Sequence, residues 1–582
     1  MGGDYYLLAV GALAGMIITL GAAGSFRKII NDRKRNKNGE WSEDFDAFEE
    51  LKLPSKPGGI MRRKRSDSSG SASPCLPGEH SIQLRVNDSA SRNTVEALLC
   101  ELVRLQTKSK DVRLSSLRGF SVSLENMAKA AVEIELPKRG GVGFRLGALN
   151  IAKLRSKMSL KDVNLQGKRV LMRVDYNCPT DDATQTITDP TRIETTIPSI
   201  QAAFDGGAKC VVLIAHRGRP GGAFNRASFT LEPCAAVLQA HFPNREVKFL
   251  SECVGPSVEC ATKECAPGTI LILENLRFHF EECGSGVNPA GEKITPSLEQ
   301  VKAFKVALSK LGDVYVFEGF GAAHRPHASI VGLAEAGSTI PTRVSGLLVE
   351  KEISIFADVL STPRRPFLAI VGGSKVVDKT AVLENLLNLV DVLYIGGAMA
   401  YTFKKMLGQL AIGASLFDQE GARLVKGIMA KAKERKVKVM FPVDHVIADG
   451  FREKSNTGIV DDSQGVPEGW LALDMGPKSR AELEAEVLRS QTVLWNGPLG
   501  VCEMGAFAGG TLQTMSALVE ATRRGATTVL GGGDTGAAAR KFFVGGEAVS
   551  ELVTHTSTGG GTSLVLMEGK ELPAITALSD RE

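Results

Sequence analysis

A glycine-rich turn late in the chain has the residue types that seat a phosphate. Gly531-Gly532-Gly533-Asp534-Thr535 follows Ala526 to Leu530, an apolar run typical of a buried strand, and precedes a helical pattern from Gly536. Glycines let the backbone approach an anion, and the first free N–H groups of a helix point toward it. Asp534 is therefore a candidate ligand for a Mg²⁺ ion that bridges phosphates. For this stretch alone, a plain strand-to-helix turn is an equal alternative.

The spacing of Gly531, Gly533 and Gly536 also fits the dinucleotide-binding pattern. That pattern requires further strand–helix units to carry the second nucleotide half, and only a short, turn-rich stretch follows Gly536. The phosphates seated here are therefore expected to belong to a mononucleotide.

Other turns of this kind follow predicted strands in the second half of the chain. They are Gly372-Gly373-Ser374-Lys375 with Lys379 one helical turn later, Gly396-Gly397, and Trp495-Asn496-Gly497-Pro498 leading to Glu503. None is a Walker A sequence, because the lysines follow a Gly-Gly turn instead. Together with the first turn they predict a crevice for nucleotide phosphates and ribose.

Arginines and histidines gather after predicted strands in the first half of the chain. The segments are Arg173 to Asn177, His216 to Arg219, Glu274 to His279 and His324 to His327, with Arg192 in a loop. The strand ends of a parallel sheet meet at one edge, so this edge collects Arg192, Arg219, Arg277, Arg325, His216, His324 and His327. Guanidinium forks suit phosphate and carboxylate oxygens, although a single arginine is most often a surface ion pair. Without matching acids, the cluster predicts a small, strongly anionic ligand, with Asp175 and Asn177 at its hydroxyl.

The alternation of strand-like and helical stretches indicates how these residues are positioned. Apolar runs recur at 169–174, 210–215, 269–273 and 314–317, and again at 367–371, 392–395, 438–441, 492–495 and 527–530. This alternation predicts an α/β protein with two doubly wound parallel-sheet domains. Residues 342–360 are predicted to form one amphipathic helix that connects them.

The N-terminal region has a different texture. Residues 5–24 carry no charge and are long enough for a membrane helix, and Arg27 and Lys28 begin a basic flank. The positive-inside rule then places the C-terminal side of this run in the cytosol. A cleaved signal peptide is disfavoured because no positive charge precedes the apolar run. The basic run Arg62 to Arg65 lies in a charged, Ser/Gly-rich stretch, which indicates a linker.

Composition bounds the remaining possibilities. The chain has 582 residues, a formal net charge of +5 and ten cysteines without a CxxC pair. The charge is too mild to imply nucleic acid, and the cysteines are expected to be reduced thiols without a metal site.

We expect these parts: a transmembrane anchor (1–26), a linker (27–80), a small accessory α/β module (81–150), an anion-binding domain (151–341), a hinge helix (342–360), a nucleotide-binding domain (361–554) and a C-terminal segment that packs back on the first domain (555–582).

The ordered motifs from about residue 155 to residue 575 resemble phosphoglycerate kinase nearly end to end. Arg173-Val174-Asp175-Tyr176-Asn177-Cys178-Pro179 is similar to the family signature RVDFNVP, and the cationic and glycine-rich segments above match in the same order, as do Thr558 to Gly561. The resemblance implies reversible phosphoryl transfer from 1,3-bisphosphoglycerate to Mg-ADP, giving 3-phosphoglycerate and Mg-ATP. It also implies a monomeric catalytic part.

The resemblance also assigns roles to individual residues. Arg192 and Lys375 resemble the catalytic cations that steady the moving phosphoryl group. The implied substrate-binding residues are Asp175, Tyr176, Asn177, Arg192, His216, Arg217, Gly218, Arg219, Arg277 and Arg325. The implied nucleotide-binding residues are Gly373, Lys375, Lys379, Gly397, Asn496, Glu503, Gly532, Gly533, Asp534 and Thr535, with Asp534 at Mg²⁺.

Three departures from the family pattern keep a second hypothesis open. Phe317-Glu318-Gly319 stands where the family usually has Asn-Asp-Ala, and Ala398 and Ala472 replace glycines. Each added methyl group is expected to crowd a backbone–ligand contact. The alternative to an active kinase at a membrane is therefore a catalytically impaired scaffold or sensor with the same fold.

Overall fold

The computed structural model describes residues 156–181, 183–222, 226–334 and 337–581. The predicted membrane helix, linker and accessory module lie outside the described residues. Within the described ranges, no helix is both long enough and apolar enough to span a bilayer.

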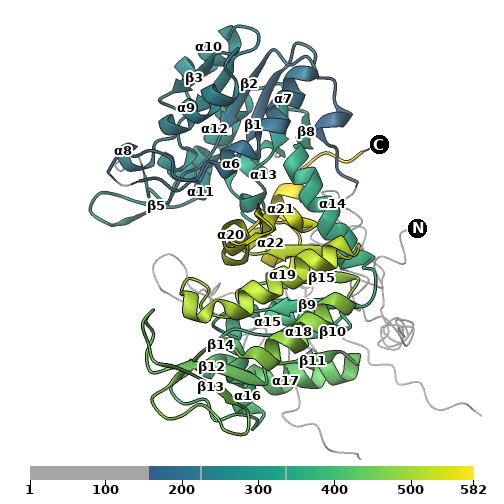
Figure 1. Ribbon diagram of the computed structural model, residues 1–582. Helices are drawn as coiled ribbons and strands as arrows, with labels where there is room; N and C mark the ends of the chain where they lie inside the picture. Colours follow the sequence, from purple (N-terminus) through teal and green to yellow (C-terminus); the bar gives the residue numbers. More distant parts are fainter. Residues whose placement is uncertain (1–155, 182, 223–225, 335–336, 582) are drawn as a thin grey trace, which may run out of the picture. The chain divides into compact units, whose positions relative to one another are not determined.

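The first lobe is built on a parallel sheet with the strand order β3-β4-β2-β1-β7-β8. Its strands are β1 (Arg169–Arg173), β2 (Cys210–Ile214), β3 (Val247–Leu250), β4 (Ile270–Leu273), β7 (Val314–Phe317) and β8 (Thr342–Ser345). Successive side chains of a strand face opposite sides of the sheet, so each apolar run contributes residues to the hydrophobic cores on both faces. α7 (Ile197–Asp205) and α9 (Glu232–His241) cover one face, and α10 (Pro256–Glu264) and α12 (Leu298–Ser309) cover the other (Figure 1).

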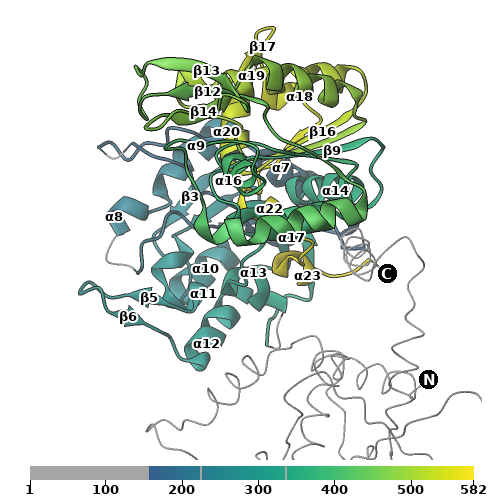
Figure 2. The same ribbon diagram turned by 90° about the horizontal axis from the view of Figure 1, so that it is seen from below.

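The second lobe has a parallel sheet with the order β11-β10-β9-β15-β16-β19. Its strands are β9 (Phe367–Val371), β10 (Val392–Ile395), β11 (Lys438–Met440), β15 (Thr492–Asn496), β16 (Thr527–Gly531) and β19 (His555–Thr556). Figure 2 shows α18 (Pro477–Arg489) and α19 (Gly509–Arg523) on one side of this sheet. On the other side lie α17 (Gln419–Arg435) and α22 (Gly561–Met567). The predicted α/β class with parallel sheets is confirmed.

The connecting helix begins later than predicted. Residues 342–345 form β8, which pairs in parallel with β7, and α14 runs over Leu347–Ser361. The expected single helix over 342–360 is therefore wrong at its first turn. Thr342 and Val344 are β-branched and fit a pleated edge strand, and Gly346 separates the strand from the helix.

The C-terminal residues contact the first lobe. The backbone N–H of Ser579 donates to Arg343 at 2.8 Å, and the N–H of Met158 donates to Ser579 at 2.9 Å. Glu352 of α14 receives a hydrogen bond from His555 Nε2 at 2.8 Å, and both side chains are buried. The C-terminal segment thus contacts β8 through Ser579 and the connecting helix through His555.

Candidate functional site

A buried guanidinium with free donors lies in the cluster of arginines and histidines of the first lobe. Arg277 follows β4 and is only 8% exposed. Its Nη1 donates to the carbonyl of Gly218 at 2.6 Å, whereas Nε and Nη2 have no partner among the described residues. Asn275 fixes the turn by accepting a hydrogen bond from the Arg277 N–H at 3.1 Å. A buried, unpaired cation is costly, so this arrangement favours an anionic ligand.

Arg173 lies beside this group at the end of β1, and sequence reasoning did not select it. It is fully buried, donating through Nε to Ser329 Oγ at 2.9 Å and through Nη2 to His216 Nδ1 at 3.1 Å. Because a guanidinium can only donate, Nδ1 of His216 must accept, and the imidazole proton is on Nε2. Glu282, another buried residue that the sequence did not indicate, accepts from the N–H and hydroxyl of Ser329. The sequence predicted arginines and histidines without acidic partners, but the Glu282 carboxylate lies next to this cluster.

The histidines of the cluster are neutral. Burial lowers the pKa of His216 well below its usual value, and the charges of Arg173 and Arg277 lower it further against the opposing effect of Asp175. Burial and the same arginines lower the pKa of His327 to about 3. The positive potential at this edge therefore comes from the arginines, and the imidazoles contribute hydrogen bonds.

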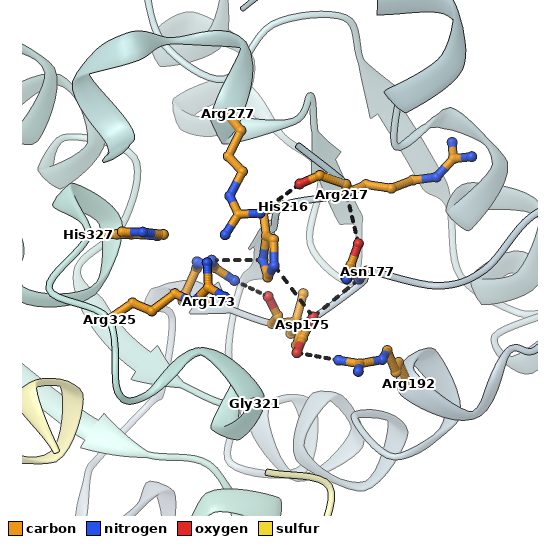
Figure 3. A network of polar contacts seen from close by, with 12 residues as sticks. Arg173, Asp175, Asn177, Arg192, His216, Arg217, Arg277, Gly321, Arg325 and His327 are labelled. Atoms are coloured by element: carbon orange, nitrogen blue, oxygen red, sulfur yellow. Dashed lines mark hydrogen bonds and ion pairs between the residues drawn. The ribbon is translucent and has the colours of Figure 1, made fainter. Parts of the chain in front are cut away.

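Asp175 and Arg192 form an ion pair at the same edge (Figure 3). Burial alone would raise the pKa of Asp175, but its interactions with the nearby His216 imidazole and with the Arg192 and Arg173 guanidinium groups outweigh burial, so the pKa is lowered. A side chain at Gly321 would put its Cβ 2.5 Å from Asp175 Oδ2, so only glycine leaves room for the pair. The Arg192 side chain remains 43% exposed and can reach a ligand.

Other predicted residues of the first lobe make core or loop contacts. The Tyr176 hydroxyl lies 3.0 Å from Thr196 Oγ1 in the core. The Arg217 side chain points away from the cluster in Figure 3 and donates to the Thr230 carbonyl at 2.7 Å. Asn177 accepts from the Gly218 N–H at 2.7 Å. These residues shape the loops that carry the cluster.

Two further arginines complete the predicted set. Arg219 is exposed, and Arg325 is half-buried with its Nε 3.2 Å from His324 Nε2. Arg219 lies in the loop after β2 and Arg325 in the segment after β7, both on the carboxyl side of the sheet strands.

Glycines of the second lobe bring strand ends close together. Gly373 and Gly397 have φ values of +132° and +65°, which side chains rarely adopt. A Cβ at Gly397 would lie 2.7 Å from the N–H nitrogen of Gly373, and one at Gly532 would lie 2.9 Å from Asn496 Nδ2. The bare backbone is therefore required where β9, β10, β15 and β16 end.

Buried Asn496 and half-buried Lys379 form the centre of this edge. Lys379 Nζ donates to Asn496 Oδ1, while Asn496 Nδ2 is buried without a partner among the described residues. Burial lowers the pKa of Lys379, although the charge of Asp534 opposes this effect. Thr535 supports the adjoining turn by accepting from the Gly497 N–H at 2.8 Å. The free amide donor indicates a missing acceptor, such as a phosphate or ribose oxygen.

The remaining predicted residues of this lobe are on its surface. Lys375, Glu503, Gly533 and Asp534 are exposed, and Asp534 lies in the first turn of α20 (Gly533–Lys541). One carboxylate is enough for Mg²⁺ when substrate phosphates supply other ligands, so Asp534 fits that role.

The residues that depart from the expected pattern fit within the folded chain itself. Ala398 has φ −64° and ψ −26°, a helical conformation that alanine adopts freely. Ala472 is buried in a cluster with Tyr401 and Ile412. Glu318 is fully buried and accepts from the N–H groups of Leu348 and Val349.

In the described ranges, one side-chain group has metal-ligand geometry. Ligand atoms of Glu252, Cys253 and His279 lie within 4.8 Å of one another. His279 Nε2 is already 2.7 Å from Glu252 Oε1, and Arg226 pairs with the same carboxylate at 3.4 Å. Internal partners therefore satisfy this group.

The chain is similar to known proteins over its C-terminal three quarters. The sequence model of the family described as phosphoglycerate kinase matches residues 160–570. Phosphoglycerate kinase of Dictyostelium discoideum is 48% identical over 431 residues, covering 74% of this chain and 99% of its own. Phosphoglycerate kinase 2 of Sus scrofa is 46% identical over 427 residues, covering 73% and 99%. The structure of phosphoglycerate kinase from Coxiella burnetii matches with a TM-score of 0.61 and 32% identity, covering 72% of this chain and 98% of its own.

Proposed function

This chain belongs to the phosphoglycerate kinase family and is a phosphotransferase; we propose that it transfers a phosphoryl group between 1,3-bisphosphoglycerate and Mg-ADP, with one substrate at each sheet edge. The observation that carries the assignment of the first edge is the buried Arg277 guanidinium with two unpaired donor nitrogens. A phosphate on the remote end of the glycerate substrate would satisfy them. Arg219 and Arg325 supply further donors.

The other end of the glycerate lies toward Asp175 and Arg192. Asp175 stays ionised because neighbouring cations lower its pKa, so it can accept a hydrogen bond from the substrate hydroxyl. Arg192 keeps an exposed guanidinium that can also meet the transferring phosphoryl group. Phosphoryl transfer depends on positioning and charge neutralisation more than on acid–base chemistry, which suits a site whose histidines are neutral.

The nucleotide is proposed to bind at the glycine-lined edge of the second lobe. Lys379 and Asn496 would contact its phosphates and ribose, and Lys375, exposed beyond Gly373, would approach the moving phosphoryl group. Asp534 would hold the magnesium ion, which neutralises phosphate charge when bound.

The test is a coupled kinase assay on the full-length chain with 3-phosphoglycerate and Mg-ATP. Arg277→Ala is expected to raise the KM for 3-phosphoglycerate by at least tenfold, a loss of roughly 1.4 kcal/mol or more, because charge-assisted hydrogen bonds to a phosphate are lost. Arg435→Ala, an exposed arginine of α17, is the matched control. A wild-type chain without turnover would favour the scaffold alternative. Unchanged KM in Arg277→Ala would remove this residue from the phosphate seat.

We further propose that residues 5–24 anchor the protein in a membrane with its catalytic part in the cytosol as a monomer. The support is the uncharged run and its basic C-terminal flank. Full-length protein should stay in the membrane pellet after alkaline carbonate, and a chain lacking residues 1–26 should be released with its activity intact. Extraction of the full-length chain by carbonate would contradict a spanning helix. Sedimentation of the released chain measures its oligomeric state.

A further inference from the structure

Two thiols of the first lobe lie against each other away from the substrate cluster. Cys265 Sγ lies 2.7 Å from Cys210 Sγ. Cys210 is the first residue of β2 and is fully buried, whereas Cys265 directly follows α10 and is partly exposed. The proposed kinase reaction uses neither residue.

We propose that Cys210 and Cys265 form a dithiol site that a small disulfide such as glutathione disulfide oxidises to an intramolecular disulfide. Three observations support it: the sulfur atoms are in contact, one of the two thiols is accessible, and 55 sequence positions separate the two cysteines. A disulfide that closes a long loop restricts the unfolded chain more than one that closes a short loop.

The exposures set the order of the chemical steps. The Cys265 thiolate attacks one sulfur of glutathione disulfide, forms a mixed disulfide and releases one glutathione thiolate. The Cys210 thiol then gives up its proton and attacks Cys265 Sγ, which forms the protein disulfide and releases the second glutathione. In total, two protein thiols are oxidised and one glutathione disulfide is reduced to two glutathione molecules. Burial raises the pKa of Cys210, so Cys210 is the resolving thiol and not the first nucleophile.

The disulfide would join α10 to β2, two elements that otherwise have few contacts with each other. α10 buries only Val258 and Thr262 of its own residues, and Lys209 Nζ donates to the carbonyl of Lys263 at 2.9 Å near its end. Cys210 begins β2, while His216 follows the opposite end of that strand. The disulfide would therefore fasten α10 to the sheet at the edge opposite the substrate cluster, stabilising the lobe without entering the site.

The experiment incubates reduced full-length protein with glutathione disulfide, blocks free thiols and maps peptides by mass spectrometry. The expected product is a Cys210–Cys265 cross-linked peptide pair, lighter by two hydrogen atoms and separated by dithiothreitol. Cys265→Ser should abolish it, and Cys210→Ala should leave a glutathione adduct on Cys265. Cys260→Ser, an exposed cysteine on α10, is the matched control and should keep the cross-link.

Two results would overturn the proposal. One is wild-type protein in which Cys265 keeps a glutathione adduct while Cys210 stays free, and the other is protein in which both thiols stay free. The cross-linked protein is also expected to melt several degrees higher than the reduced protein, with unchanged turnover. An unchanged or lower melting temperature would show that the bond does not fasten α10 to β2. These readouts do not depend on the substrate assignment.

Discussion

Replacing Glu318 with glutamine should flatten the pH dependence of stability between pH 4.5 and 7. The carboxyl group is fully buried behind β7 and accepts from the Ser199 hydroxyl and from the N–H groups of Leu348 and Val349, at the start of α14. Gly346 leaves the space it occupies, because a Cβ there would collide with the carboxylate. Glu318 thus connects the end of a sheet strand to the connecting helix.

The sign of the effect follows from the pKa of Glu318. Burial raises it from 4.5 to about 7, although the hydrogen bonds from Ser199, Leu348 and Val349 oppose this. Between these values the folded state binds a proton that the unfolded state has released, so stability falls as pH rises through the window. The contribution is fully present below pH 4.5 and is lost by about pH 7. It amounts to about 3 kcal/mol, because one pKa unit corresponds to about 1.36 kcal/mol.

The assay is urea unfolding of the full-length chain, followed by circular dichroism at several pH values from 4.5 to 7.5. Subtracting the glutamine variant's curve from that of the parent isolates the proton bound by Glu318. The difference should fall by about 3 kcal/mol across the window. Glu420→Gln, an exposed glutamate in the first turn of α17, should give a curve parallel to the parent. Parallel curves for the Glu318 variant as well would refute the reasoning.

Three other predictions concern the proposed reaction. Arg192→Ala and Lys375→Ala should each lower kcat on the order of a hundredfold to a thousandfold, with the Kd for Mg-ADP unchanged in Arg192→Ala; a kcat of Arg192→Ala within a few-fold of the parent would mean that Arg192 acts only as the ion-pair partner of Asp175. Asn496→Ala should weaken Mg-ADP binding about tenfold in calorimetry, because the unpaired amide donor is lost; undiminished affinity would place the nucleotide elsewhere. Solution scattering should show compaction when both substrates bind, as the lobes close about α14; an equal radius of gyration with both sites filled would argue against closure.

Most of the parallel strands were predictable because they are short apolar runs bounded by glycine or charge, whereas β3, β8 and β19 were not predicted. Predicted and observed bounds of β1, β2, β4 and β7 agree within one residue at each end. The start of α14 was not predictable in this way. Residues 342–345 contain one apolar residue, Val344, too few to distinguish a helix from an edge strand by periodicity, and pairing with β7 decided between them.

The glycine turns of the second lobe were also visible in the sequence, because a positive φ or a close backbone approach leaves few other residue choices. Gly373, Gly397 and Gly532 all have positive φ values. The functional consequence of a substitution was less visible. Ala398 stands where the family pattern has a glycine, and its helical φ and ψ suit alanine.

Which arginines have hydrogen-bond partners within the protein could not be predicted, because the acceptors come from distant parts of the chain. Arg173 is the last residue of β1, and Arg217 and Arg277 follow β2 and β4, so all three lie at or just after the ends of parallel strands. Arg217 is satisfied by the carbonyl of Thr230 and the hydroxyl of Thr180, and Arg173 by Ser329 and His216.

Arg277 is the strand-end arginine of these three that folding buries while leaving two donor nitrogens unpaired. Folding that leaves a buried cation unsatisfied costs stability unless a ligand supplies the missing acceptors. The same reasoning applies to the buried amide of Asn496 in the second lobe. Residue type therefore indicated which groups favour anions, and the hydrogen-bond acceptors around each group in the folded chain separate the groups that the protein satisfies from those with donors available to a ligand.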